Sequence, residues 1–158
     1  MATIALGVVM FILIILSMVL ILMYARSHLV ASGDVTITNV AGEAKAESVS
    51  GDVTIEGSKL DRADLETVSG DVVFESELRR GGRLHAEAVS GEIGLEFAGT
   101  IEGRFEIDTH NGDIENCFGP EPKRKSKYTP GETLHFQEGD GDARVTASTV
   151  NGDIGICR

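Results

Sequence analysis

Acidic residues recur at one fixed place in this sequence, directly after a repeated glycine, and stacked carboxylates can bind a metal ion. The acids at this place are Asp34, Asp52, Asp71, Glu92, Asp113 and Asp153. If the repeats stack, Asp52, Asp71 and Glu92 form a column of the oxygen ligands that Ca²⁺ prefers. The alternative is that they are solvated turn residues that hydrogen-bond the local backbone. Because the sequence lacks the nonapeptide of calcium-binding β-rolls, we expect turn residues and no metal.

The two cysteines occupy equivalent places, each five residues after a repeated glycine. Cys117 follows Gly112, and Cys157 follows Gly152. Neighbouring strands of a sheet lie about 4.8 Å apart, which is within the Cα separation of a disulfide. If another strand intervenes, the separation is about 10 Å and no bond can form. The sequence therefore leaves two alternatives, a disulfide or two free thiols in a reducing compartment.

No set of residues has the pattern of a catalytic site. The serines before the repeated glycines have no recurring histidine or lysine partner, and the four histidines lack metal-ligand spacing. The sequence also contains no phosphate-binding loop, no dinucleotide fingerprint and no C-x-x-C pair. Since a nucleophile, a base and an oxyanion site are not assembled, the sequence predicts neither an enzyme nor a cofactor.

A segment at about 118–142 interrupts the repeat and carries a dense basic cluster: Lys123, Arg124, Lys125 and Lys127. Prolines and glycines in this segment indicate loops, so we expect an insertion of one hairpin or a poorly formed repeat. The cluster is either a solvated loop tip or a contact for anionic lipid headgroups or an acidic partner.

The elements that position these residues are repeats of about 20 residues, each with a Ser-Gly-Asp corner or a close variant. The corner glycines are Gly33, Gly51, Gly70, Gly91, Gly112 and Gly152. Small or apolar residues lie at −7, −5, −3, +2 and +4 from nearly every one of these glycines and alternate with polar ones, which is typical of strands; Asn116, at +4 from Gly112, is an exception. The sequence predicts an all-β fold at 32–158, a β-solenoid of about six two-strand repeats that stack to bury their apolar faces. An antiparallel sandwich is the alternative.

An unbroken apolar run precedes the repeats, from Ile4 to Tyr24. As a helix it is about 31 Å long, which is enough to cross a membrane. A signal peptide is the alternative, but it needs a basic start, a shorter apolar stretch and a cleavage site. We expect a transmembrane α-helix within a 1–31 anchor and linker, and Arg26 favours a cytoplasmic location for the repeats.

Composition limits the classes of partner. The chain has a formal net charge of −11 and an isoelectric point near 4.7, so nucleic acid would be repelled. Tryptophan is absent and aromatic residues make up 5 %, so no stacking platform for bases or sugars is apparent.

Residues 32–158 resemble a bacterial adhesin-like β-solenoid family of unknown function. The resemblance rests on the Val-Ser-Gly-Asp-Val corners and on the tail from Asn111-Gly112-Asp113-Ile114, through Tyr128-x-Pro130-Gly131, to Asn151-Gly152-Asp153-Ile154. It implies an exported or membrane-linked protein without known catalysis.

Residues 1–37 look like the amino-terminal anchor of the F subunit of the sodium-translocating NADH:quinone oxidoreductase. The residues that carry this are Thr3-Ile4-x-Leu6-Gly7-Val8-Val9-Met10-Phe11 and Gly33-Asp34-Val35-Thr36-Ile37. Two cysteines cannot supply the four thiolates of a [2Fe–2S] cluster, so only the anchor carries over. The overlap of both resemblances at 33–37 suggests a fusion.

Together these patterns predict a non-enzymatic, single-pass protein of the bacterial inner membrane that displays a solenoid as a binding or assembly scaffold. The expected partners are the lipid bilayer and either another protein or a second copy, paired through the open edge of the solenoid. The alternative is an anchor that assembles with the sodium-translocating reductase. The solenoid family and the cysteine pair suit the periplasm; the helix and Arg26 favour the cytoplasmic side, which we expect.

Overall fold

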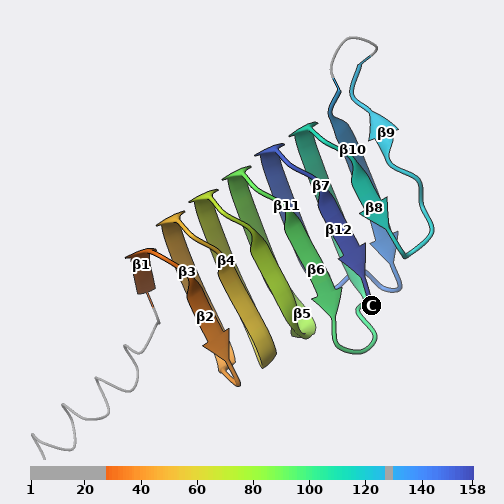
Figure 1. The fold of residues 1–158 in the computed structure, drawn as a ribbon. Helices are drawn as coiled ribbons and strands as arrows, with labels where there is room; N and C mark the ends of the chain where they lie inside the picture. Colours follow the sequence, from red (N-terminus) through yellow and green to blue (C-terminus); the bar gives the residue numbers. More distant parts are fainter. Residues whose placement is uncertain (1–27, 127–129) are drawn as a thin grey trace, which may run out of the picture.

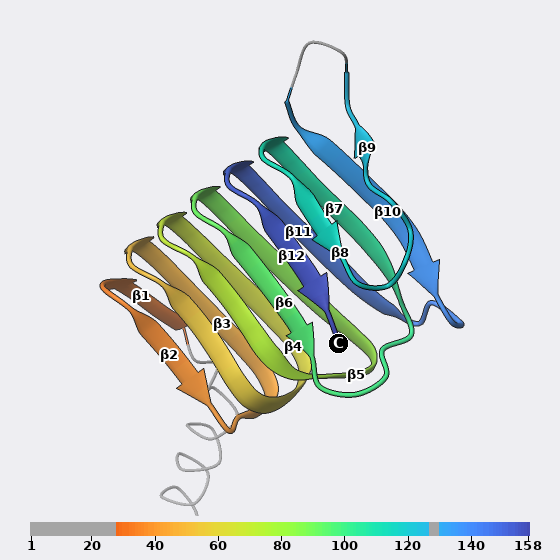
Figure 2. The same cartoon turned by 45° about the vertical axis from the view of Figure 1, so that its right-hand side comes forward.

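The computed structural model describes residues 28–126 and 130–158, which form one curled, twelve-stranded sheet. The predicted all-β repeat is confirmed, and Figures 1 and 2 show strands stacked in two layers. In chain order the strands are β1 (His28–Ser32), β2 (Val35–Thr38), β3 (Ala41–Ser50), β4 (Val53–Ser69), β5 (Val72–Ser90), β6 (Ile93–Phe97), β7 (Gly103–Asn111), β8 (Ile114–Asn116), β9 (Lys123–Arg124), β10 (Glu132–Glu138), β11 (Ala143–Asn151) and β12 (Ile154–Cys157).

The predicted membrane helix at residues 4–24 lies outside the described residues. In the part of the chain that the structure describes, no helix is long and apolar enough to cross a membrane. Strand β1 begins at His28, within the segment expected to be a linker, and pairs in parallel with β3.

Each rung of the sheet is a strand that leads into a corner glycine and a strand that leaves it. The predicted inward columns are buried because side chains alternate across each strand, except at Ile37 and Asn116, which are only partly buried. Before the corners, the buried residues are Ala44, Ala46, Ser48, Ala63, Leu65, Thr67, Leu84, Ala86, Ala88, Phe105, Ile107, Thr109, Val145, Ala147 and Thr149. After the corners, they are Val35, Val53, Ile55, Val72, Phe74, Ile93, Leu95, Ile114, Ile154 and Ile156.

The corners hold the rungs together through the backbone. The N–H of Gly70 donates to the carbonyl of Ser90 at 3.1 Å, and the N–H of Gly91 donates to the carbonyl of Asn151 at 3.0 Å. Both glycines have positive φ, 147° and 153°. A Cβ on Gly91 would lie 1.9 Å from the carbonyl oxygen of Gly70, so no other residue fits at this corner without displacing the backbone.

A buried column of hydroxyl groups reinforces the corners. Thr67, Thr109 and Thr149 each donate a hydrogen bond of 3.1 Å to the carbonyl of the corner glycine on the neighbouring rung. Ser48 makes the equivalent bond to Gly33 at 3.2 Å. A buried hydroxyl needs such a partner, so these polar side chains fit a mostly apolar interior. Ala88 occupies the same column without a hydroxyl.

The rungs do not stack in chain order. Strand β11 pairs in parallel with β5 on one side and β7 on the other, and β12 lies between β6 and β8. The last repeat in the sequence therefore fills a place inside the stack (Figures 1 and 2). The amides of Asn111 and Asn151, which stand where other corners have serine, meet across this junction at 3.0 Å.

The predicted insertion is a hairpin that covers one end of the sheet. Strand β10 pairs antiparallel with β7 and with the short β9. Leu134 is buried, and the ring of Phe136 stacks on Phe105 with centroids 4.4 Å apart. At the opposite end, β1 and β2 pair with β3 and β4 on one side and with no other strand among residues 28–126 and 130–158. One end of the sheet is thus capped and the other is an open edge.

Candidate functional site

The acidic column after the corner glycines is occupied by hydrogen bonds between rungs. Oδ1 of Asp52 accepts the N–H of Asp71 at 2.8 Å, and Oδ1 of Asp71 accepts the N–H of Glu92 at 2.8 Å. Asp34 and Asp153 accept from the next rung in the same way. Among the described residues, no group of three or more histidine, cysteine, aspartate or glutamate side chains is placed to hold a metal ion. These carboxylates therefore act as hydrogen-bond acceptors for the backbone N–H groups of the next rung.

Substitutions of Asp71 distinguish a hydrogen-bond acceptor from a metal ligand at this position. Asp71→Ala removes the acceptor for the N–H of Glu92 and should cost about 1 kcal/mol of unfolding free energy, whereas Asp71→Asn keeps an oxygen there and should cost less than half of that. Urea titrations measure both values. Calcium should not change the melting temperature of the unmodified chain, since the carboxylates already accept backbone N–H groups. A rise with calcium that Asp71→Asn abolishes would favour a metal site.

The structure joins Cys117 and Cys157 in a disulfide, with Cα atoms 4.9 Å apart. This pairing depends on the rung order, because β8 and β12 are neighbours. The N–H of Cys117 also donates to the carbonyl of Ile156 at 2.9 Å. The bond links the capped end of the sheet to the rung inside it.

Three of the four residues of the predicted basic cluster lie in the described part of the chain, at the start of the hairpin. Lys125 forms an ion pair of 2.8 Å with Asp108 on β7, so it anchors the hairpin. Lys123 and Arg124 form β9 and are exposed, and Lys127 lies outside the described residues. Of the three described members, Lys125 is therefore paired with Asp108, and Lys123 and Arg124 remain exposed.

Asp108 is the acid that receives this hairpin. Burial alone would raise its pKa, but hydrogen bonds from Lys125 and Thr133 and the charges of Lys125 and His135 hold the pKa below its usual range. A lowered folded-state pKa adds stability above the unfolded pKa and loses it as the pH falls through the folded value.

Asp108→Asn should therefore be less stable than the original chain at pH 7, and the gap should close below about pH 4. The gap should be under about 1 kcal/mol because the pair is partly exposed. Urea unfolding from pH 7 to pH 2 measures it, and Lys125→Met should give the same pH dependence. A gap that stays constant over this range would show that the carboxylate charge is not its cause.

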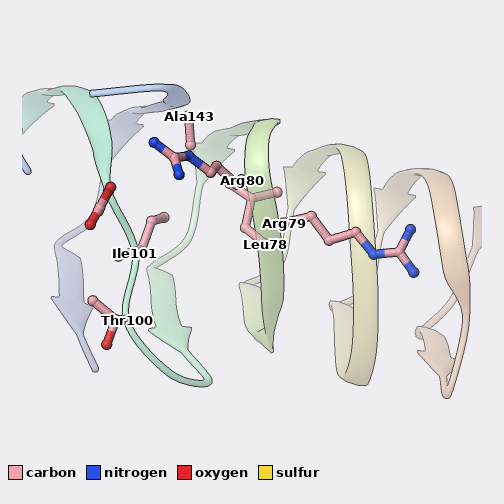
Figure 3. Close-up of a pocket in the computed structure, with 7 residues that line it drawn as sticks. Leu78, Arg79, Arg80, Thr100, Ile101 and Ala143 are labelled. Atoms are coloured by element: carbon pink, nitrogen blue, oxygen red, sulfur yellow. The ribbon is translucent and has the colours of Figure 1, made fainter. Parts of the chain in front are cut away.

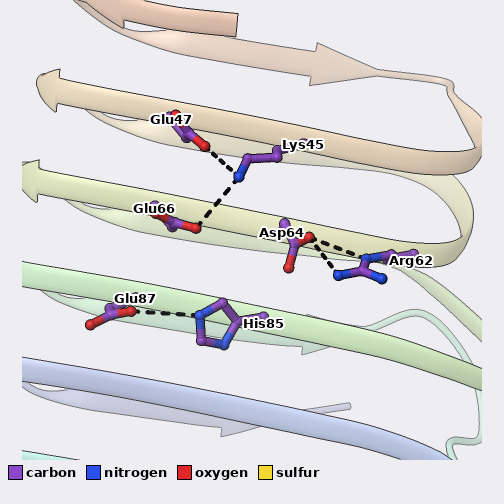
Figure 4. A network of polar contacts seen from close by, with 7 residues as sticks. All are labelled: Lys45, Glu47, Arg62, Asp64, Glu66, His85 and Glu87. Atoms are coloured by element: carbon purple, nitrogen blue, oxygen red, sulfur yellow. Dashed lines mark hydrogen bonds and ion pairs between the residues drawn. The ribbon is translucent and has the colours of Figure 1, made fainter. Parts of the chain in front are cut away.

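The outward face of the layer formed by β3, β4 and β5 is a network of short ion pairs (Figure 4). Lys45 contacts Glu47 and, at 3.8 Å, Glu66 on the next rung. Hydrogen bonding by Glu47 raises the pKa of Lys45 despite the opposing effect of burial. Arg62 pairs with Asp64 at 3.1 Å. Most charges on this part of the face are therefore satisfied within the chain.

An arginine column runs along the same face, eight residues before the corner glycines. The register aligns Arg62 with Arg83, Arg83 with Arg144, and Arg144 with Arg104 on four consecutive rungs. Sequence reasoning missed this column, although the signal was present: an arginine stands at −8 in four repeats. Neighbouring members are about 4.8 Å apart along the stack at the usual strand spacing.

Three of these arginines line a shallow groove of about 370 Å³, which we call the arginine groove. Its lining is Gly81, Arg83, Arg104, Gly141, Asp142, Ala143 and Arg144. Arg144 lies 3.4 Å from Glu106. Within the described ranges, Arg83 and Arg104 form neither an ion pair nor a side-chain hydrogen bond. The groove therefore presents positive charge that the chain does not neutralise.

A smaller cavity of about 180 Å³ adjoins the groove where the chain crosses between β6 and β7. Leu78, Ile101 and Ala143 give it an apolar lining (Figure 3). Arg80 extends toward Ala143, whereas Arg79 points away along the stack. Arg80 forms an ion pair of 2.6 Å with Asp142 at the rim of the groove, so the charge of Arg80 is balanced there.

A stripe of exposed valines lies two residues before four corners: Val49, Val68, Val89 and Val150, each between 42 % and 56 % exposed. The first three line a shallow groove of about 310 Å³ beside Glu47, Glu66 and Glu87. The register places the valines on consecutive rungs, so they form a continuous apolar ridge.

The fold and its outward columns can be compared with known proteins. No solved structure matches the chain. A family of β-structured repeat domains does match, over residues 27–157, which include every corner, the hairpin and both cysteines. The match begins before β1 and leaves residues 1–26 outside it, so it gives no support to the F-subunit-like anchor. The function of this family is unknown. The chain belongs to the Toastrack DUF4097 family.

Proposed function

We propose that the chain is a non-enzymatic, single-pass membrane protein that displays its Toastrack domain as a binding or assembly scaffold. The observation that carries the proposal is the outward face of the β3, β4, β5, β11 and β7 layer. Exposed valines repeat there on consecutive rungs, and so do arginines, of which Arg83 and Arg104 have no carboxylate partner among the described residues. An exposed apolar row rimmed by charge is typical of an interaction surface.

The rungs give such a surface its rigidity. Each corner is fixed by backbone hydrogen bonds to the next rung, and the inward columns are closely packed. Side chains on a rigid face lose less conformational freedom when a partner binds, so more of the contact energy appears as affinity. A ridge with one side chain per rung suits a long partner that contacts several rungs at once.

The proposed membrane anchor joins the open end of the sheet. Only residues 25–27 separate the predicted helix at 4–24 from β1, which is the edge strand at that end. In this arrangement the hairpin cap and the disulfide lie at the end farther from the anchor along the stack. Arg26 favours the cytoplasmic side for the domain, as the positive-inside rule states.

Photocrosslinking in cells tests the interaction surface. A p-benzoylphenylalanine placed at Val89 in the full chain should give a discrete crosslinked product. The same group at Thr54, on the other layer of the sheet, should not. Equal products from both positions, or none from Val89, would contradict a binding role for the valine face.

Alkaline extraction of membranes tests the anchor. The full chain should stay in the membrane pellet, and the Ile14→Arg/Ile15→Arg variant should be released, because charged side chains at the centre of a membrane helix are costly. Association with the sodium-translocating reductase stays a hypothesis that co-purification of its other membrane subunits would support. Release of the unmodified chain would contradict the anchor.

A further inference from the structure

We propose that the arginine groove binds a phosphate ligand that carries two or more anionic groups, as a linear oligophosphate does. The groove is defined by Arg83, Arg144 and Arg104, with Arg144 on the central rung of the three. This site requires neither the membrane anchor nor the protein partner of the proposed function.

The first support is unbalanced charge in an acidic protein. The chain carries 25 acidic and 14 basic residues, yet in the described ranges no carboxylate pairs with Arg83 or Arg104. Like charges held on neighbouring rungs repel one another. On other rungs the basic residues of this face are paired, as Arg62 is with Asp64 and Lys45 with Glu47. A bound anion would supply the partner that the groove lacks.

The second support is the match between guanidinium groups and phosphate. A guanidinium presents a planar fork of N–H donors that binds two oxygens of a phosphate at once. Arg83 and Arg104 flank Arg144 at about one rung spacing on each side, so the row spans about 10 Å. A single small anion cannot bridge this length. A chain of phosphate groups lying along the stack can contact all three arginines.

Because the carboxylate of Glu106 already pairs with Arg144, we expect a ligand that binds Arg144 more strongly than a carboxylate does. Glu106 lies 3.4 Å from Arg144, and both side chains are exposed. A terminal phosphate group of an oligophosphate carries more charge than a carboxylate and offers three acceptor oxygens. It can therefore displace Glu106 from Arg144 and also engage the two flanking arginines.

The floor of the groove leaves room for a ligand. Gly81, Gly141 and Ala143 also line the groove, and they bring no long side chain into the space. Asp142, which would repel an anion, is held by Arg80 at the rim through an ion pair of 2.6 Å. The acids nearest the groove are thus each engaged by an arginine.

Titration of the full chain in neutral nanodiscs with sodium tripolyphosphate tests the site. Tripolyphosphate should raise the melting temperature, and sodium chloride at equal ionic strength should not. Arg83→Gln/Arg104→Gln should bind tripolyphosphate at least about tenfold more weakly by calorimetry, since charge-assisted hydrogen bonds are the strong ones. Both residues are exposed, so the variant should fold, and relief of repulsion should leave its melting temperature in low salt unchanged or higher.

A charge-matched variant controls for general electrostatics. Lys59→Gln/Arg79→Gln removes two positive charges that are paired with Glu77 and Asp61, outside the groove. It should bind tripolyphosphate as the unmodified chain does. The proposal is overturned if the groove variant binds as tightly as the unmodified chain, or if the control variant loses affinity equally.

The source of the phosphate is tested by changing the lipid. If the groove takes phosphate headgroups, nanodiscs containing phosphatidylglycerol should weaken tripolyphosphate binding in the unmodified chain. If the ligand is a free oligophosphate, neutral and anionic nanodiscs should give the same affinity. Either result supports a phosphate site. A crosslink at Val89 concerns the valine face, so failure of one proposal does not imply failure of the other.

Discussion

Gly91→Ala is expected to destabilise the sheet by about 4 kcal/mol or more, the largest effect of any single substitution considered. The new Cβ would lie 1.9 Å from the carbonyl oxygen of Gly70, and that oxygen belongs to the backbone, which has no rotamer to move. The φ of 153° adds strain that a side chain must bear. Overpacking and strained backbone each contribute about 1–3 kcal/mol. Urea denaturation followed by circular dichroism measures the loss.

Gly33→Ala is the matched control for this prediction. Gly33 has a similar φ of 135°, but no atom lies within 4 Å of the position of a new Cβ, because its rung is the last at the open end. Only the backbone strain of about 1–3 kcal/mol should then appear. If the two variants lose the same stability, contact between rungs does not determine the choice of glycine, and our account of the corner is wrong.

Removing the disulfide is expected to have the second largest effect. Cys117 and Cys157 are separated by 40 residues, and closing a loop of that size stabilises a fold by roughly 4 kcal/mol in the chain-entropy treatment. The loop includes the hairpin cap and β11, so both should loosen in the Cys117→Ser/Cys157→Ser variant. Urea unfolding measures the loss of stability. Hydrogen exchange of the β10, β11 and β12 amides shows which of these strands lose protection.

Reduction of the unmodified chain is the control. Dithiothreitol should bring its stability to that of the double serine variant and should leave the variant unchanged. If the freshly isolated protein shows two reactive thiols in denaturant, the bond does not form in the cell compartment that holds the domain. Identical unfolding curves with and without reductant would also contradict a stabilising disulfide.

The repeat and its buried columns were predictable from the sequence because they follow from local rules. Period-two alternation around each glycine determines which side chains face inward, as at Leu65 and Ile107. The corners follow from the chemistry of Gly-Asp. The cysteine geometry was predictable only as two alternatives, because it depends on which rungs are neighbours.

The order of the rungs could not be predicted from the repeat itself. Each corner presents the same backbone groups, so a rung can stack on any other with little local preference. Two side-chain signals distinguish the last rungs. Asn111 and Asn151 replace serine and pair with each other, and Phe105 requires the aromatic cap that Phe136 and Phe118 supply. These signals are long-range, and their meaning becomes clear only when the partners are known.

The arginine groove was missed for a related reason. Position −8 lies one residue before the first inward position and faces outward, so it belongs to none of the inward columns. The four arginines share this phase but have different neighbours in the sequence, such as Asp61 before Arg62 and Gly82 before Arg83. Register, rather than composition, brings them together.

The place of β11 and β12 inside the stack has a consequence for biosynthesis. A ribosome adds residues at about 5–20 per second, and the early rungs can pair as they emerge. In the native order, the rung of Gly112 docks on β11 and β12 rather than on β5 and β6, and these two strands have not yet been made. The nascent chain therefore has β5 and β6 edges without their native partners until residue 157 has left the exit tunnel. A ribosome that stops before Ala143 therefore releases a chain with a gap inside its sheet, and the exposed edges would mark it for degradation.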